Sequence, residues 1–351
     1  MQARTGRAQE KTPARRRING GRAIRWGIWR GIRSGAALGL LVWASGAEAQ
    51  RVGEPPEPGR VYTGEGRWIG GLPDLAARLA ETRFVAIGET HDNPDHHRIQ
   101  AALTASLKPE VLAFEMFPEE SEEALNDLRA FGVSRARLAE ALDWENRGWG
   151  DWDFYAQILE AAPWAGVTGG GLPRDVLRRV SAEGLSAAPG DLVARYGLEA
   201  PLAPEAEAAL LGILNESHCG HLPAARVGGM MAVQRLWDAS FAEAWARGAG
   251  EEGRGVLIAG AAHVRSDWAA PALMRRAHPE ARVAAVGLFG HRPEAQTLAD
   301  YDLAPYDFIV ITEADPERPD PCAGLRAAAE ARARAEAGAP EEPEAGETGA
   351  P

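Results

Sequence analysis

The sequence predicts an α/β fold, a largely parallel sheet flanked by helices, with a mostly helical insertion capping one end. Short apolar runs that end in glycine or a polar turn alternate with longer runs whose apolar residues recur at helical spacing. This alternation is interrupted over about residues 185–250, where the pattern stays helical. Strand–helix alternation is typical of a parallel sheet with helices on both faces.

Six buried strands are expected, because each run is short, apolar and bounded by turn residues. They are 84–87, 111–114, 166–169, 256–259, 283–286 and 307–312. Helices are expected at 94–107, 119–131, 173–182, 204–214, 230–246 and 267–277. Asp92-Asn-Pro94 favours the start of the first helix, since proline fits the first helical position.

Residues 1–49 carry the three parts of a secretory signal peptide in order. Residues 1–33 contain ten Lys/Arg, 35–44 are apolar, and 45–49 end in an Ala-x-Ala sequence. The apolar run is too short to span a bilayer, and no cysteine follows the cleavage site to form a lipobox. We therefore expect an exported, periplasmic protein; a fortuitous basic tail is the alternative.

The two ends of the mature chain are expected to lie outside the main fold. Residues 50–66 are rich in proline and glycine, which predicts an extended lead-in. Residues 325–351 are low in complexity, acidic and without aromatics, which predicts a disordered tail with at most a helical turn or two.

Charge argues against nucleic acid as a partner. Removal of residues 1–49 takes ten of the 38 Lys/Arg and two of the 50 Asp/Glu, leaving a net charge of −20. Such a field repels phosphate backbones. The two cysteines, Cys219 and Cys322, are either one disulfide in an oxidising compartment or two unrelated thiols.

Two strand ends share a Gly-x-x-His turn. Gly88-Glu-Thr-His91 follows the strand at 84–87, and Gly260-Ala-Ala-His263 follows the strand at 256–259. Ligand sites in parallel sheets form outside the carboxyl ends of the strands, and glycine allows a sharp turn and a close approach. We therefore expect both imidazoles in one crevice, where His91 and His263 could bind a metal. The alternative is two turn histidines bonded to backbone.

Two carboxylates lie at the same strand ends. Glu89 belongs to the first turn, and Glu115 ends the strand at 111–114; each could act as a general base or ligand, or simply cap a helix. His96 and His97 follow at the helix start, and at most one of them is expected to face inward, because helical neighbours diverge by about 100°.

Three further candidates lie in or near the predicted helical insertion. His218 and His221 stand at a glycine-containing break between two helices, where helix capping is the alternative. Arg174 follows a glycine run and suits an anion, although a surface salt bridge is the more common fate of arginine.

Seven segments in this order resemble the ChaN family. They are Phe84-Val-Ala-Ile-Gly-Glu-Thr-His-Asp-Asn93, Phe114-Glu-Met-Phe117, Leu172-Pro-Arg174, Ser217-His-Cys-Gly-His-Leu-Pro223, Ala232-Val-Gln-Arg-Leu-Trp-Asp238, Ile258-Ala-Gly-Ala-Ala-His-Val-Arg265 and Tyr306-Asp-Phe-Ile-Val-Ile-Thr312. The resemblance implies a ChaN-like domain over 67–324. Carried over by position, the site would contain Glu89, His91, Glu115, Arg174, His218, His221 and His263.

ChaN-like proteins are described as iron-regulated, haem-binding uptake proteins, in a superfamily with Tiki metalloproteases and erythromycin esterase-type hydrolases. The resemblance therefore implies haem or a transition metal ion as cofactor, with a homodimer and an outer-membrane uptake system as candidate partners. Haem binding in the family is associated with a Tyr ligand. None of the five tyrosines matches it by position; they are Tyr62, Tyr155, Tyr196, Tyr301 and Tyr306.

Two functions follow as expectations. The first is a periplasmic haem- or iron-binding protein in uptake, since haem needs an axial His or Tyr, apolar walls and cations. The second is a metal-dependent hydrolase, in which Glu89 or Glu115 would act as general base on a metal-bound water; His91 activated by Glu89 is a metal-free variant of it. No Gly-x-Ser-x-Gly sequence is present, so a serine hydrolase is not expected.

Overall fold

The computed structural model describes residues 53, 55–315, 318 and 320–337 of the 351. The chain divides into Met1–Trp43 and Ala44–Pro351, and every element below belongs to the second unit. The expected signal peptide and the last part of the expected tail, 338–351, lie outside the described residues. No helix within the described ranges is long and apolar enough to cross a membrane.

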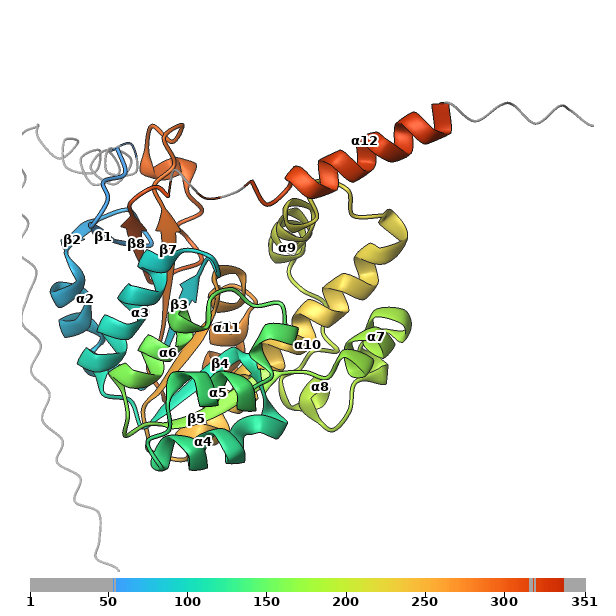
Figure 1. The fold of residues 1–351 in the computed structure, drawn as a ribbon. Coiled ribbons are helices and arrows are strands. Elements are labelled where there is room, and N and C mark those ends of the chain that lie inside the picture. Colours follow the sequence, from blue (N-terminus) through green and yellow to red (C-terminus); the bar gives the residue numbers. More distant parts are fainter. Residues whose placement is uncertain (1–52, 54, 316–317, 319, 338–351) are drawn as a thin grey trace, which may run out of the picture. The chain divides into compact units, whose positions relative to one another are not determined.

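Eight strands form one sheet in the order β2-β1-β8-β7-β3-β6-β4-β5 (Figure 1). Their bounds are β1 Val61–Thr63, β2 Trp68–Gly70, β3 Phe84–Glu89, β4 Val111–Pro118, β5 Gly166–Gly171, β6 Gly255–Gly260, β7 Val283–Gly290 and β8 Phe308–Thr312. All pairs from β8 across to β5 are parallel, whereas β1 pairs antiparallel with β8 and with β2. The predicted α/β fold and its six parallel strands are confirmed.

The α-helices of the described residues lie between and beyond these strands. They are α2 Leu72–Leu79, α3 Pro94–Leu107, α4 Glu122–Ala130, α5 Arg135–Ala141, α6 Trp152–Ala161, α7 Arg174–Glu183, α8 Leu192–Arg195, α9 Pro204–Ser217, α10 Ala224–Ala249, α11 Ala270–Ala277 and α12 Ala323–Ala337. The start of α3 follows the sequence closely, because Asn93 caps it by accepting from the backbone N–H groups of Asp95 and His96, and Pro94 is the first helical residue.

The sheet is covered on both faces, which explains why its central strands are apolar throughout. Successive residues of a strand point to opposite faces. In β3, Val85 and Ile87 belong to one core cluster, which also contains residues of α3 and α6. Phe84 and Ala86 belong to the other, beneath α10 and α11. The central strands are therefore packed on both faces, which fixes the positions of their carboxyl ends relative to one another.

The helical insertion does more than cap one end of the sheet. The second half of α10 lies on a sheet face, where Trp245 is fully buried and packs edge-on against Phe84 at 5.3 Å. A Cβ at Gly255 of β6 would stand only 2.6 Å from the Trp245 ring, so glycine is required for this close approach. Figure 1 shows α7, α8 and α9 grouped around the same helix.

Both ends of the fold differ from the expectation. The lead-in at 50–66 was expected outside the main domain, but Val61 and Tyr62 are fully buried in β1, so the sheet begins before residue 67. The tail was expected to be disordered from 325, yet 323–337 form α12, because an alanine-rich segment has high helix propensity. Cys219 and Cys322 form a disulfide that joins the loop after α9 to the start of α12.

Candidate functional site

The two Gly-x-x-His turns meet at the carboxyl edge of the sheet. β3 and β6 are neighbours, with Glu89 paired opposite Gly260, so both turns leave the sheet side by side. The Nε2 atoms of the two histidines approach the same oxygen, Oε1 of Glu115, at 3.9 Å from His91 and 3.6 Å from His263. Neighbouring parallel strands thus bring two imidazoles, far apart in sequence, to one carboxylate.

Glu115 is held in this position by the end of β6. Its Oε2 accepts the backbone N–H of Gly260 at 2.7 Å, which links the end of β4 to the end of β6. A Cβ at Gly260 would stand 3.1 Å from His91 Nε2. Glycine at this position therefore provides the room in which the His91 ring approaches Glu115.

Each imidazole is also backed by a second buried carboxylate. His91 Nδ1 donates to Glu89 Oε1 at 2.8 Å, and His263 Nδ1 donates to Asp238 Oδ1 of α10 at 2.7 Å. Glu89 accepts two further hydrogen bonds, from the Tyr155 hydroxyl at 2.8 Å and from the Gln100 amide at 2.6 Å. These bonds fix the orientation of both rings and leave each Nε2 directed at Glu115.

The electrostatics of the cluster favour charged imidazoles. Burial alone would lower the pKa of His91, but Glu115 and Glu89 outweigh it and raise that pKa to about 9. For His263, burial is likewise outweighed by Glu115 and Asp238, which raise its pKa. Burial raises the pKa of Asp238 to about 6, although His263 opposes the shift.

The cluster can therefore hold and exchange protons at the edge of the sheet. Its five members are Glu89, His91, Glu115, Asp238 and His263, called the carboxylate–histidine cluster below. The ring of His91 is the accessible one, with 37% of its side chain exposed beside Trp149, whose ring centre lies 5.0 Å away. Over the described ranges, no three His, Cys, Asp or Glu side chains are arranged to hold a metal ion. A metal at His91 and His263 therefore stays a prediction.

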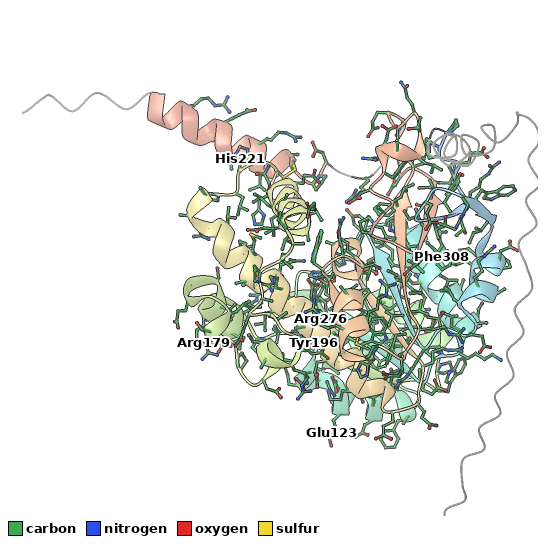
Figure 2. The ribbon with its side chains drawn as sticks, turned by 180° about the vertical axis from the view of Figure 1, so that it is seen from behind. Glu123, Arg179, Tyr196, His221, Arg276 and Phe308 are labelled. Atoms are coloured by element: carbon green, nitrogen blue, oxygen red, sulfur yellow. A yellow bond between two sulfur atoms is a disulfide. The ribbon has the colours of Figure 1, made fainter. Side chains whose placement is uncertain are left out.

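The other three expected site residues lie elsewhere. Arg174 is exposed at the start of α7, and His218 Nδ1 bonds to the Leu214 carbonyl at 2.7 Å, so it caps the end of α9. His221 is exposed in the loop between α9 and α10, and Figure 2 shows it beside the start of α12. None of the three has a hydrogen bond or ion pair with the carboxylate–histidine cluster within the described part of the chain.

The expectation that at most one of His96 and His97 faces inward was wrong, because both are fully buried. The helix start is enclosed on two sides. His96 Nδ1 accepts the backbone N–H of Thr90 at 2.9 Å, and burial lowers the pKa of His96 to about 3, so the ring is neutral. His97 Nε2 bonds to the His91 carbonyl at 3.0 Å, and its ring stacks on Phe154. Both rings therefore hydrogen-bond to the backbone of the turn that contains His91.

A cavity of about 880 Å³ opens beside the cluster, over the carboxyl ends of β3, β6, β7 and β8. Thr90 and Ala261 from the two turns form part of its wall. The other walls are the α9 face with Ala209, Gly212 and Ile213, and the end of β7 with the residues that follow it, 289–294. Charged side chains complete the lining: Arg265, Arg318, Glu216, Asp300, Asp302 and Asp315.

His291 is the cavity residue that our sequence analysis missed. It directly follows Gly290, the last residue of β7, so the rule that ligand residues follow strand ends would have found it. The strand was expected to end at 286, which hid this relation. Arg292 was missed for the same reason, whereas Arg265 ends one of the segments that resemble the ChaN family and was not singled out as a site residue.

The fold and the cavity at the carboxyl edge of the sheet define the class of protein. A parallel sheet that carries convergent side chains and a cavity at its carboxyl edge is typical of a small-molecule-binding α/β protein. The family follows from the sequence match: residues 75–274 fit the model described as haem-binding uptake, Tiki superfamily, ChaN. This is more than half of the chain, and the chain belongs to that family. The match does not favour the hydrolase alternative.

One solved structure supports the fold. A structure described as cofacial heme binding to ChaN of Campylobacter jejuni is similar at 17% identity and a TM-score of 0.52, over 73% of this chain and 98% of that one. The type III effector HopBA1 (12% identity, TM-score 0.39, 70% and 94% covered) and a succinoglycan biosynthesis protein (10%, 0.40, 77% and 97%) match too weakly to carry an argument. No curated protein matches the chain.

Proposed function

We propose that this protein binds haem in the cavity beside the carboxylate–histidine cluster and acts, after export, in haem or iron uptake. The observation that carries the proposal is the cavity itself. Its volume of about 880 Å³ falls within the range of about 300–1,000 Å³ that ligand pockets span. It also opens where parallel sheets bind their ligands, and the family to which the chain belongs is a haem-binding one.

Part of the cavity wall supplies groups that haem needs. Haem needs an apolar wall for its macrocycle, cations for its propionates and a donor for its iron. Ile213 and Phe289 supply apolar surface, Arg265 and Arg292 supply guanidinium groups, and His291 supplies an imidazole. The wall also carries five carboxylates, those of Glu216, Glu294, Asp300, Asp302 and Asp315. Bound haem would supply the iron that is the cargo of uptake, and the residues of this chain would hold and orient it.

The oxidising compartment has independent support. The Cys219–Cys322 disulfide belongs to a class of bond that persists in secreted and periplasmic proteins and is rare in reducing ones. The signal-peptide pattern of residues 1–49 points the same way. We therefore propose a periplasmic location, which cell fractionation of the tagged full-length chain would test.

The relative from Campylobacter jejuni is described as binding haem cofacially. By analogy, we propose that two copies of this chain associate when each holds a haem at its cavity. Analytical ultracentrifugation should then show a mass that doubles on addition of hemin, and an unchanged monomer at saturating hemin would contradict this part of the proposal.

A hemin titration with a blocked cavity tests the proposed site. A Cβ at Gly212 of α9 would meet no atom within 4 Å, so the first side-chain atom of Gly212→Trp is accommodated and the indole extends from the cavity wall. Gly228 of α10 has equal room but does not line this cavity, and Gly228→Trp is the matched control.

Wild type and Gly228→Trp should shift the hemin Soret band saturably and with similar affinity. Gly212→Trp should weaken binding by about tenfold or more, which corresponds to about 1.4 kcal/mol. Equal hemin affinity in all three proteins, or no Soret shift with wild type, would contradict the proposal.

A further inference from the structure

We propose that the disulfide between Cys219 and Cys322 is a redox switch for α9, the helix that forms one wall of the cavity. While the bond is intact it fixes the carboxyl end of α9, and its reduction releases that end and loosens the wall. The proposal goes beyond haem binding, because it concerns the wall itself and applies to any ligand that the cavity takes.

The disulfide lies at the ends of two segments that line the cavity. Glu216 of α9 lines the cavity, and Cys219 lies just beyond the end of this helix. Arg318, which follows β8 in the chain, also lines the cavity, and Cys322 directly precedes α12. The disulfide therefore joins two parts of the cavity wall through cysteines that are 103 residues apart.

The apolar contacts of α9 stop before its carboxyl end. The buried side chains of the helix are Ala206, Leu210 and Leu214, which pack in one cluster with Trp268 and Ala269. The last of them precedes the disulfide by more than one helical turn. Core packing therefore holds the first part of α9 more firmly than its last turn.

The last turn of α9 and the loop after it make local hydrogen bonds. The backbone N–H groups of residues 219–221 donate to carbonyls of residues 215–218, and the His218 ring bonds to the Leu214 carbonyl. Leu222, partly buried, is the next side chain that packs against the apolar cluster. Over the described ranges, the disulfide is the one covalent, ionic or hydrogen bond that residues 215–221 make to a distant part of the chain.

The other side of the disulfide offers no strong substitute for it. The described side chains of α12 are exposed, so this helix has no apolar contact with the core. Arg318 Nε donates to both carboxylate oxygens of Asp92 at 2.9 and 3.0 Å, which ties this part of the chain to the turn after His91. Both partners of this ion pair are exposed, and exposed pairs contribute little to stability.

The backbone at Cys219 favours a change once the bond is broken. Cys219 has a φ of 56° and Gly220 a φ of 76°, both in the left-handed region. Glycine adopts this region freely, whereas a residue with a side chain is disfavoured there. Reduction removes the bond that holds Cys219 in place, so the loop can relax and the end of α9 can move with it.

The switch needs a dithiol oxidoreductase as reductant. Both cysteines are half-buried, so they lie near the surface and not in the core. A thiolate of the reductant attacks one sulfur of the disulfide and forms a mixed disulfide, while the other sulfur leaves as a thiolate and takes up a proton. The second thiol of the reductant then attacks the mixed disulfide, so the reductant ends as a disulfide and both cysteines end as thiols.

Hydrogen exchange followed by mass spectrometry tests the proposal. It compares oxidised wild type, wild type treated with dithiothreitol, and the Cys219→Ser/Cys322→Ser double variant with and without dithiothreitol. Peptides that cover 209–221 should exchange about tenfold or more faster in reduced wild type and in the double variant than in oxidised wild type. Dithiothreitol should leave exchange in the double variant unchanged, which makes this variant the control for the reagent.

Peptides of β3 and β6 should stay protected over the same period in every sample, because these strands are packed on both faces of the sheet. They distinguish a loosened wall from unfolding of the whole chain. Alkylation of the native protein after dithiothreitol should label both cysteines.

Three results would overturn the proposal. Equal exchange of 209–221 in oxidised and reduced wild type would show that α9 does not depend on the bond. Faster exchange of β3 and β6 together with α9 would show that the disulfide stabilises the whole fold and is no switch. A bond that dithiothreitol reduces only after denaturation would be closed to any reductant in the native protein.

Discussion

Replacement of Asp238 by asparagine tests whether the buried pair of Asp238 and His263 in the carboxylate–histidine cluster stabilises the fold. The 2.7 Å bond between Asp238 Oδ1 and His263 Nδ1 joins two side chains that are 1% and 8% exposed. Breaking a buried ion pair of this kind costs about 3–5 kcal/mol. Asparagine can still accept the His263 proton, but its amide would occupy the place of Asp238 Oδ2, which has no hydrogen-bond partner, so a buried donor is left unpaired at a cost of about 1–3 kcal/mol.

Glu115 Oε1 remains 3.6 Å from His263 and retains part of the attraction, so we expect the lower end of the range, about 3 kcal/mol. Urea unfolding at pH 7 of wild type, Asp238→Asn, His263→Gln and the double variant measures it. The losses of unfolding free energy in the two single variants, added together, should exceed the loss in the double variant by about 1 kcal/mol or more, as for residues in contact. Additive costs, or a loss below about 0.5 kcal/mol for Asp238→Asn, would refute the reasoning.

Three further predictions concern charge, the disulfide and packing. The pKa of His91 is raised from 6.5 to about 9, so its contribution to stability is complete below pH 6.5 and is lost as the pH rises through about 9. Because over a third of the side chain is exposed, we expect a contribution of about 1–2 kcal/mol. Over that pH window the unfolding free energy of wild type should fall by this much more than that of His91→Gln, and parallel curves for the two proteins would contradict the prediction. Replacement of Cys219 and Cys322 by serine should cost about 2–4 kcal/mol, because the bond closes a loop of 103 residues, and reductant should then change the melting temperature of wild type only. Gly255→Ala should cost about 1–3 kcal/mol, because the new Cβ would meet the Trp245 ring, and an unchanged denaturant midpoint would show that the ring can move.

Much of the fold could be predicted because the central strands are covered on both faces. Covered strands read as continuous apolar runs, and 84–87, 111–114 and 256–259 are of this kind. β1 and β2 could not be predicted, since strands of three residues in a proline- and glycine-rich stretch leave too short a pattern.

Part of the candidate site could likewise be predicted from the sequence, and part of it could not. The convergence of the turns that contain His91 and His263 follows from strand order, which the repeated Gly-x-x-His signal indicates. Asp238 carries no such signal, because it lies within α10 and meets His263 only through tertiary packing. His96 and His97 are both buried because two different elements cover the start of α3, which helical periodicity does not encode.

The most direct test of the central claim is the position of the iron in crystals of the protein with hemin, located from anomalous diffraction at the iron edge. The account predicts one strong peak per chain, inside the cavity between α9 and the end of β7. A peak between His91 and His263, or one on the outer surface away from this cavity, would contradict it.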